Sequence, residues 1–225
     1  MLKIFGPLLA EILRFSQIDD SNRDDHSHLR AGDTCYYMFE YTSHKGYSFS
    51  KTNQLISNLK KKPSQTGRAD YKYKARAISE CAQTLSAALN PAWLATATLV
   101  PTPGSKAVGH ADYDDRIEQI CRRLRNPSPD VRRLVVQDQS TNASHEMGPG
   151  ERVTVDELMA VYRIDETCTN PPPAQIGIVD DVLTAGTHYR AMHTILSHRF
   201  PTVPIIGIFV ARRVFPEDPL DISDL

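Results

Sequence analysis

The chain has 225 residues, of which 40% are hydrophobic and 24% charged, as is usual for a globular protein. A formal net charge of −1 gives no global reason to expect binding to nucleic acid. No apolar run reaches the roughly 18 residues that a membrane-spanning helix needs, and four widely spaced cysteines without a Cys-x-x-Cys pair argue against a zinc knuckle or a disulfide framework.

The first 72 residues predict a helix, a polar loop, a strand and a second helix. Residues 1–15 favour an amphipathic helix over a signal peptide, because Pro7 and Glu11 interrupt the apolar stretch. We therefore expect a cytoplasmic protein that does not enter a membrane. Residues 35–42 are aromatic and β-branched, which predicts a strand. Residues 50–61 predict a helix capped by Ser50 or Thr52.

From residue 73 onward, helical and strand patterns alternate. The apolar spacing predicts helices over 73–89, 112–125, 155–161 and 187–198, and strands over 95–100, 133–137, 175–179 and 205–210. Apolar strands that alternate with amphipathic helices are typical of a parallel sheet covered on both faces, an α/β fold of the Rossmann-like kind. We place the boundary of this unit at residue 73, after an N-terminal accessory segment of residues 1–72.

Three predicted strands end in polar or glycine-containing loops, over residues 101–110, 138–152 and 180–188. Ligands of such sheets bind outside the carboxyl ends of the strands. We therefore expect a binding site where these three loops meet.

The last of these loops carries the strongest chemical signal. A buried strand delivers two adjacent carboxylates, Asp180 and Asp181, to a short turn with Gly186 that opens a helix. Unpaired N–H groups at a helix start bind phosphate, and the hydroxyls of Thr184 and Thr187 can add donors. Carboxylates beside a phosphate site fit ribose hydroxyls and a magnesium ion. Together these features indicate recognition of a phosphorylated ribose.

This segment resembles the 5-phosphoribosyl 1-pyrophosphate (PRPP) binding motif of type I phosphoribosyltransferases. Asp180 and Asp181 match the acidic pair, Val182 and Leu183 the two aliphatic residues, and Thr184, Ala185, Gly186 and Thr187 the phosphate loop. The Thr-Ala-Gly-Thr form looks similar to orotate phosphoribosyltransferases, and the general layout to ComF-type proteins. Two departures are Gly177, which thins the packing of the strand, and His188, which replaces a small hydroxyl residue.

The resemblance implies roles for the other loops. Thr102, Pro103, Gly104, Ser105 and Lys106 would hold the pyrophosphate, and Pro101, Pro103 and Arg116 look like a ComF-type pattern. Residues 138–152 would form a mobile lid, with His145 and Arg152 as candidate cations for the leaving pyrophosphate. The accessory segment 1–72 would be a hood that selects the acceptor. Without the family resemblance, residues 101–110 could be a proline turn with a solvent-facing lysine, and residues 138–152 a simple connector.

The implied activity is transfer of a phosphoribosyl group from PRPP to a base or related small-molecule acceptor, with release of pyrophosphate and use of Mg²⁺ near Asp180 and Asp181. This would place the protein in nucleotide metabolism, and a homodimer is one assembly to be expected. A second interpretation is a non-catalytic relative that senses PRPP or a nucleotide, or binds a protein partner in a nucleic-acid-related process. A third is a nucleic-acid binder that uses the local basic run of Lys60–Lys62, Lys72, Lys74 and Arg76.

Overall fold

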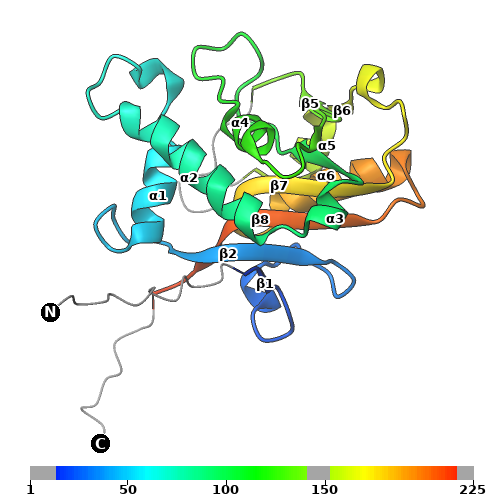
Figure 1. Cartoon of the computed structure of the whole chain (residues 1–225), viewed down its shortest axis with the longest axis horizontal. Helices are drawn as coiled ribbons and strands as arrows, with labels where there is room; N and C mark the ends of the chain where they lie inside the picture. The colour runs from blue at the N-terminus through cyan, green and yellow to red at the C-terminus, as the bar shows by residue number, and fades with distance from the viewer. Residues whose placement is uncertain (1–13, 141–152, 217–225) are drawn as a thin grey trace, which may run out of the picture.

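The computed structural model describes residues 14–140 and 153–216, which form an α/β domain around a six-stranded sheet (Figure 1). The strand order is β1-β2-β8-β7-β3-β4, and β1 is the antiparallel edge strand of an otherwise parallel sheet. The strands are β1 (Ser16–Gln17), β2 (Cys35–Thr42), β3 (Ala97–Pro101), β4 (Asp130–Val131), β7 (Gln175–Leu183) and β8 (Ile205–Val214).

Helices cover both faces of this sheet, which confirms the predicted parallel α/β architecture. The α-helices are α1 (Lys51–Leu59), α2 (Lys72–Ala88), α3 (Pro91–Leu94), α4 (Arg116–Arg123), α5 (Val155–Val161) and α6 (Thr187–Arg199). Three short 3₁₀ helices, η1 (Arg23–Asp25), η2 (Pro63–Gln65) and η3 (Glu166–Cys168), lie in the connections. Ser50 caps α1, as expected, by accepting a hydrogen bond from the backbone of Asn53.

The sheet separates two hydrophobic cores, which follow from the alternation of side chains along β7. Val179 belongs to the first core, with α1, α2 and α4, whereas Ile178 belongs to the second, with α5 and α6. Cys81 and Cys121 are buried in the first core, as their place on the predicted helices indicated. Within the described ranges, no helix is both long enough and apolar enough to cross a membrane.

Gly177 does not thin the packing of β7. A Cβ atom at this position would lie 2.9 Å from the Trp93 ring and 3.0 and 3.1 Å from side-chain atoms of Leu99 and Ile208. The neighbouring side chains therefore already fill the space that an aliphatic residue would take, and a larger residue would force them apart.

The prediction that residues 133–137 form a strand of the main sheet is wrong. From this part of the chain only β4 joins the main sheet, where it pairs with β3 over two residues, and the chain then leaves the sheet. Residues Val135–Gln137 form β5, which pairs antiparallel with β6 (Tyr162–Ile164). The reason is packing, since Leu134 and Val135 are buried in the second core beside α5 and α6.

The described part of residues 1–72 belongs to the sheet and the first core. β2 pairs with β8 along most of its length, and Leu55, Ile56 and Leu59 of α1 are buried in the first core with α2. A boundary at residue 72 therefore does not separate two cores. The predicted helix over residues 1–15 lies almost entirely outside the described residues.

Candidate functional site

A cavity of about 340 Å³ lies at the carboxyl ends of β3 and β7. Two of the three predicted loops line it, through residues 102–106 and most of residues 180–188. The end of β2, the segment that follows α1, and Arg213 near the end of β8 complete its wall. The location is the one that the parallel sheet predicted.

The remaining predicted loop, residues 138–152, falls mostly outside the described residues, and so do both of its candidate cations, His145 and Arg152. Its two flanks lie close to the cavity. The Ser140 hydroxyl accepts a hydrogen bond from the backbone N–H of Ala107 at 3.0 Å, and Val153 lines the cavity.

The acidic pair lies within β7 rather than after it. β3 pairs with β7 only as far as Val179, so Asp180 and Asp181 extend past the end of the neighbouring strand while β7 still pairs with β8. Because side chains alternate along a strand, Asp181 lies on the side of the first core and Asp180 on the side of the second. Two residues that look equivalent in sequence therefore have different surroundings.

Asp181 is buried and engaged by two cations. The Nε and Nη2 atoms of Arg116 donate to its Oδ2 atom at 2.9 and 2.7 Å, and the Lys60 ammonium lies 3.2 Å from Oδ1. Burial opposes ionisation, but Lys60 and Arg116 outweigh it and hold the pKa of Asp181 well below its usual range. The ionised carboxylate thus fixes the two cations in place.

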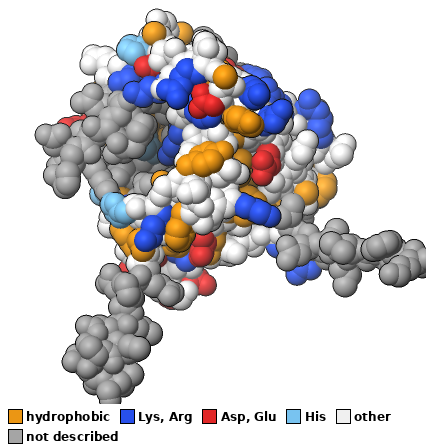
Figure 2. All heavy atoms as spheres, turned by 90° about the vertical axis from the view of Figure 1, so that its left-hand side faces the viewer, with side chains coloured by type: hydrophobic (Ala, Val, Ile, Leu, Met, Phe, Trp, Pro, Cys, Tyr) orange, Lys and Arg blue, Asp and Glu red, His pale blue; other side chains and the backbone are white. Residues whose placement is uncertain are grey.

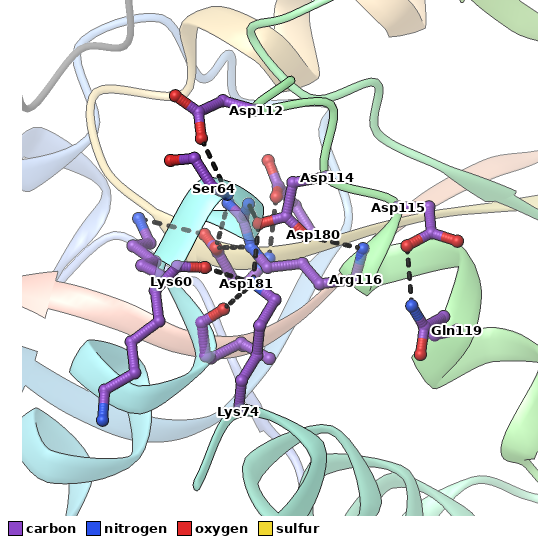
Figure 3. Close-up of polar contacts among 12 residues, drawn as sticks. Lys60, Ser64, Lys74, Asp112, Asp114, Asp115, Arg116, Gln119, Asp180 and Asp181 are labelled. Atoms are coloured by element: carbon purple, nitrogen blue, oxygen red, sulfur yellow. Dashed lines mark hydrogen bonds and ion pairs between the residues drawn. The ribbon is translucent and has the colours of Figure 1, made fainter. Parts of the chain in front are cut away.

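Arg116 links this pair to a second one, as Figure 3 shows. Its Nη1 atom donates to Asp114 at 2.8 Å, and the same carboxylate oxygen accepts from the buried Lys74 ammonium at 2.7 Å. Lys74 also donates to the carbonyl of Leu59. These contacts tie α1, α2 and α4 to β7, so Lys74 is a buried structural cation and not part of a basic surface.

Asp180 is half-buried and lines the cavity. Among the described residues its carboxylate takes part in no ion pair, and it accepts one hydrogen bond, from the backbone N–H of Asp181 at 2.7 Å. Burial and the adjacent Asp181 carboxylate raise the pKa of Asp180 above its usual range. Asp180 is therefore the member of the pair that retains capacity to bind a ligand.

The turn after β7 has the geometry of an anion site. Gly186 adopts φ 85°, in the left-handed region that favours glycine, and no side chain caps the start of α6. The first N–H groups of a helix have no partner within the helix and lie at the positive end of its dipole. Thr184, Ala185 and Thr187 line the cavity, as does the buried Val182 of the first core, whereas Leu183 is buried in the second core.

His188, where the PRPP-binding motif has a small hydroxyl residue, also lines the cavity. Its Nδ1 atom is 2.8 Å from the hydroxyl of Tyr162, which connects the start of α6 to β6. Burial lowers the pKa of His188 to about 4, so the imidazole is neutral near neutral pH. When Tyr162 donates to Nδ1, the remaining proton is on Nε2, where it can be donated to a ligand.

The loop after β3 closes the other side of the cavity. The backbone of Thr102 donates to the Val179 carbonyl at 2.9 Å, which continues the β3–β7 pairing by one residue. Thr102 is 8% exposed, and its hydroxyl has no hydrogen-bond partner in the described structure. Pro103, Gly104, Ser105 and Lys106 follow along the cavity wall. A buried hydroxyl without a partner is costly, and a bound polar group would remove that cost.

Asp180 and Asp181 differ in whether their carboxylates can act as ligands of a metal ion. No cluster of three or more His, Cys, Asp or Glu residues that could hold a metal occurs in residues 14–140 and 153–216. Both oxygens of Asp181 already bind cations, so this side chain does not fit as a ligand. Asp180 fits a Mg²⁺ ion that takes its remaining ligands from phosphate, sugar and water.

Neither the protein-family models nor the curated proteins contain a match to this chain.

The structure also adds site residues that the sequence did not single out. In the sequence, Lys60 stands out only as part of a basic run, Arg116 only through the ComF-type resemblance, and Asp114 not at all. The sequence feature that could have indicated these residues is the segment 112–116, Asp-Tyr-Asp-Asp-Arg. It is an unusually acidic stretch that ends in an arginine and precedes a predicted helix. Asp115 belongs to that stretch but bonds to Gln119, apart from the central group in Figure 3.

Proposed function

We propose that this protein binds PRPP and transfers its phosphoribosyl group to a base or related nucleophile, with release of pyrophosphate. One observation carries the proposal. An uncapped helix start with a left-handed glycine and a half-buried aspartate outside any described ion pair line the same cavity. Binding of a phosphorylated ribose requires phosphate recognition and diol recognition within one cavity.

The cavity offers a place for each part of PRPP. The amides at the start of α6, with the hydroxyls of Thr184 and Thr187, would bind the 5-phosphate. Asp180 would accept hydrogen bonds from the ribose hydroxyls. The loop of residues 102–106, with the unpartnered hydroxyl of Thr102, would bind the pyrophosphate. In this assignment, the start of α6 with Asp180 and the loop after β3 bind different parts of PRPP.

Asp180 would hold a Mg²⁺ ion, which would supply positive charge that favours the departure of pyrophosphate. The chain's own residues position the sugar. With the 5-phosphate fixed at α6 and the hydroxyls at Asp180, C1 faces the pyrophosphate loop. As the C1–oxygen bond breaks, the ring gains positive charge, and the carboxylate of Asp180 stabilises it.

Asp181 has a supporting role in this proposal. It does not touch the sugar, because Lys60 and Arg116 occupy both of its oxygens. It holds these cations at the cavity wall, where their positive charge favours an anionic ligand.

The acceptor would bind on the side formed by the first 72 residues. Tyr41 and Ser43, beside the carboxyl end of β2, line the cavity, as do Lys62 and Pro63 after α1. This arrangement supports a type I phosphoribosyltransferase fold in which the N-terminal segment completes the site from within the sheet.

Calorimetry and a pyrophosphate-release assay test the proposal. The wild-type protein should bind PRPP with Mg²⁺, and Asp180→Asn should lose most of that affinity because it removes the charge next to the diol and the metal. Asp115→Asn is the matched control, because it removes a nearby carboxylate that does not line the main cavity. Failure of the wild-type protein to bind PRPP would refute the proposal.

A non-catalytic PRPP or nucleotide sensor is the second candidate, and two observations favour it. Asp181 is engaged in ion pairs, and the neutral His188 occupies the position of a small hydroxyl residue. Binding of PRPP without pyrophosphate release, across a panel of purine and pyrimidine bases, is the result expected for a sensor.

The third interpretation, a nucleic-acid binder, has a basic surface next to the cavity in its favour. Figure 2 shows Lys and Arg side chains gathered on the face that carries α1, α2 and their connection. Lys61, Lys72 and Arg76 lie 5.3–5.5 Å from the centre of the Tyr73 ring. Salt-sensitive binding of a single-stranded oligonucleotide, weakened by Lys72→Ala, would support a nucleic-acid partner.

A further inference from the structure

The turn after β7 is held from behind by a segment that the sequence predicted only as a polar loop. The Nδ1 atom of His26 is hydrogen-bonded to the carbonyl of Thr184, and the backbone N–H of His28 donates to the carbonyl of Ala185 at 2.9 Å. Leu29 packs against Gly186, where a Cβ atom would lie 3.2 Å from its Cδ2 atom. Residues 26–29 therefore contact three successive residues of the turn.

These contacts determine the direction of the amides in the turn. In a trans peptide, the carbonyl of one residue and the N–H of the next point in opposite directions. Because the carbonyls of Thr184 and Ala185 point toward residues 26–28, the N–H groups of Ala185 and Gly186 point away from them. Neither N–H donates a hydrogen bond to any described residue. Ala185 and Thr187, on either side of Gly186, line the cavity, so the side of the turn opposite residues 26–28 is the side of the proposed anion site.

The backing segment is itself anchored to the fold. Arg190 of α6, which is 6% exposed, forms an ion pair with Asp33 and donates from Nε to the His28 carbonyl at 3.0 Å. On the other side, Arg213 of β8 donates to the carbonyl of Asp25 at 3.0 Å. The segment therefore cannot move away from the turn without breaking contacts to both α6 and β8.

The geometry points to His26 as a positioning residue that aims the amides of Ala185 and Gly186 at a phosphate monoester. This inference rests on the phosphate-binding half of the proposed function. Thr102 lines the same cavity, and its hydroxyl, which has no partner among the described residues, independently indicates a polar ligand there.

The chemistry of His26 specifies what its replacement must retain. A carbonyl only accepts hydrogen bonds, so Nδ1 carries the proton, and Nε2 is buried without a partner. The side chain is fully buried, and burial lowers its pKa, which favours this neutral form. An asparagine can place an N–H where Nδ1 lies, whereas a leucine fills the space without a donor.

The experiment uses ribose 5-phosphate as the probe, with calorimetry for affinity and amide NMR signals for the place of binding. We expect His26→Leu to weaken binding about tenfold, the usual consequence of losing one buried hydrogen bond that orients a charged site. His26→Asn should stay within about threefold of wild type. His28→Ala is the matched control, because His28 contributes its backbone and its side chain is exposed.

Two results would overturn the inference. One is unchanged ribose 5-phosphate affinity in a folded His26→Leu protein. The other is ligand binding to the wild type without a shift of the Ala185 and Gly186 amide signals, a measurement that stands even if His26→Leu fails to fold.

Pyrophosphate release separates this inference from the proposed function. If ribose 5-phosphate binds with the expected dependence on His26 but PRPP is not turned over, the transferase proposal fails and the positioning role stands. If PRPP is turned over equally by wild type and His26→Leu, the positioning role fails. Absence of ribose 5-phosphate binding by the wild type overturns both.

Discussion

Replacing Arg116 with methionine tests the buried ion pairs that position the cavity wall. The change removes two hydrogen bonds to Asp181, at 2.9 and 2.7 Å, and one to Asp114, at 2.8 Å, but keeps much of the apolar stem. Removing one partner of a buried ion pair costs about 3–5 kcal/mol. Lys60 remains near Asp181 and Lys74 near Asp114, so we expect the lower end, about 3 kcal/mol.

Urea unfolding of wild type and variants measures this cost. Arg122→Met is the matched control, because Arg122 lies on the same helix with 56% of its side chain exposed and pairs with Glu118. Such surface pairs contribute about 0–1 kcal/mol. The double variant Arg116→Met/Asp181→Asn should recover about half of the lost stability, because position 181 then no longer carries a buried charge with one partner.

The pH dependence adds a second test of the same reasoning. The folded pKa of Asp181 lies below its unfolded value of about 3.9, so its stabilisation is present above that value and is lost as pH falls through the folded pKa. Arg116→Met raises the folded pKa of Asp181. The stability difference from wild type should therefore be full near neutral pH and shrink as pH falls below about 4.

Equal stability of Arg116→Met and wild type, within about 0.5 kcal/mol, would refute this reasoning. A double variant no more stable than the single one would refute the claim that the Asp181 carboxylate, left with Lys60 alone, causes the loss.

Three further predictions follow from single residues. The pKa of Asp180 is higher in the folded protein than its unfolded value of about 3.9, so its contribution to stability is present below that value and is lost as pH rises through the folded pKa. Asp180→Asn should therefore raise the free energy of unfolding by about 1 kcal/mol or more at about pH 8. A variant that unfolds at lower urea concentration than wild type would contradict this prediction. Gly186→Ala should cost about 1–2 kcal/mol in the same assay, because φ is 85° and the new Cβ would lie 3.2 Å from Leu29; an unchanged midpoint would show that the turn relaxes freely. Asn53→Ala should lower stability by about 2 kcal/mol, measured by thermal unfolding, because Asn53 is fully buried and bonds to both the N–H and the carbonyl of Thr42.

Much of the fold follows from local sequence patterns. The strand at residues 35–42 and the helix at 155–161 have the predicted bounds, because their residue types and caps agree with their packing. The turn at Gly186 could also be predicted, since only a few residue types adopt a positive φ without strain. Local preference and tertiary packing agree in these segments, so the pattern suffices.

The positions that depend on contacts distant in sequence could not be read from the pattern. Residues 133–137 have the composition of a sheet strand, but the burial of Leu134 and Val135 against α5 and α6 draws them into a separate ribbon. Lys74 resembles a surface lysine in sequence, yet an aspartate forty residues away makes it a buried ion-pair partner.

The sequence by itself determined the α/β class, the acidic pair and the helix start that follows it. Only the tertiary structure decided that Asp181 is neutralised by Lys60 and Arg116 while Asp180 faces the cavity, and that His26 supports the turn from behind. The physical reason is that the protonation and orientation of a side chain depend on the charges and donors around it. In this protein those groups come from segments that are 65 to 158 residues apart along the chain.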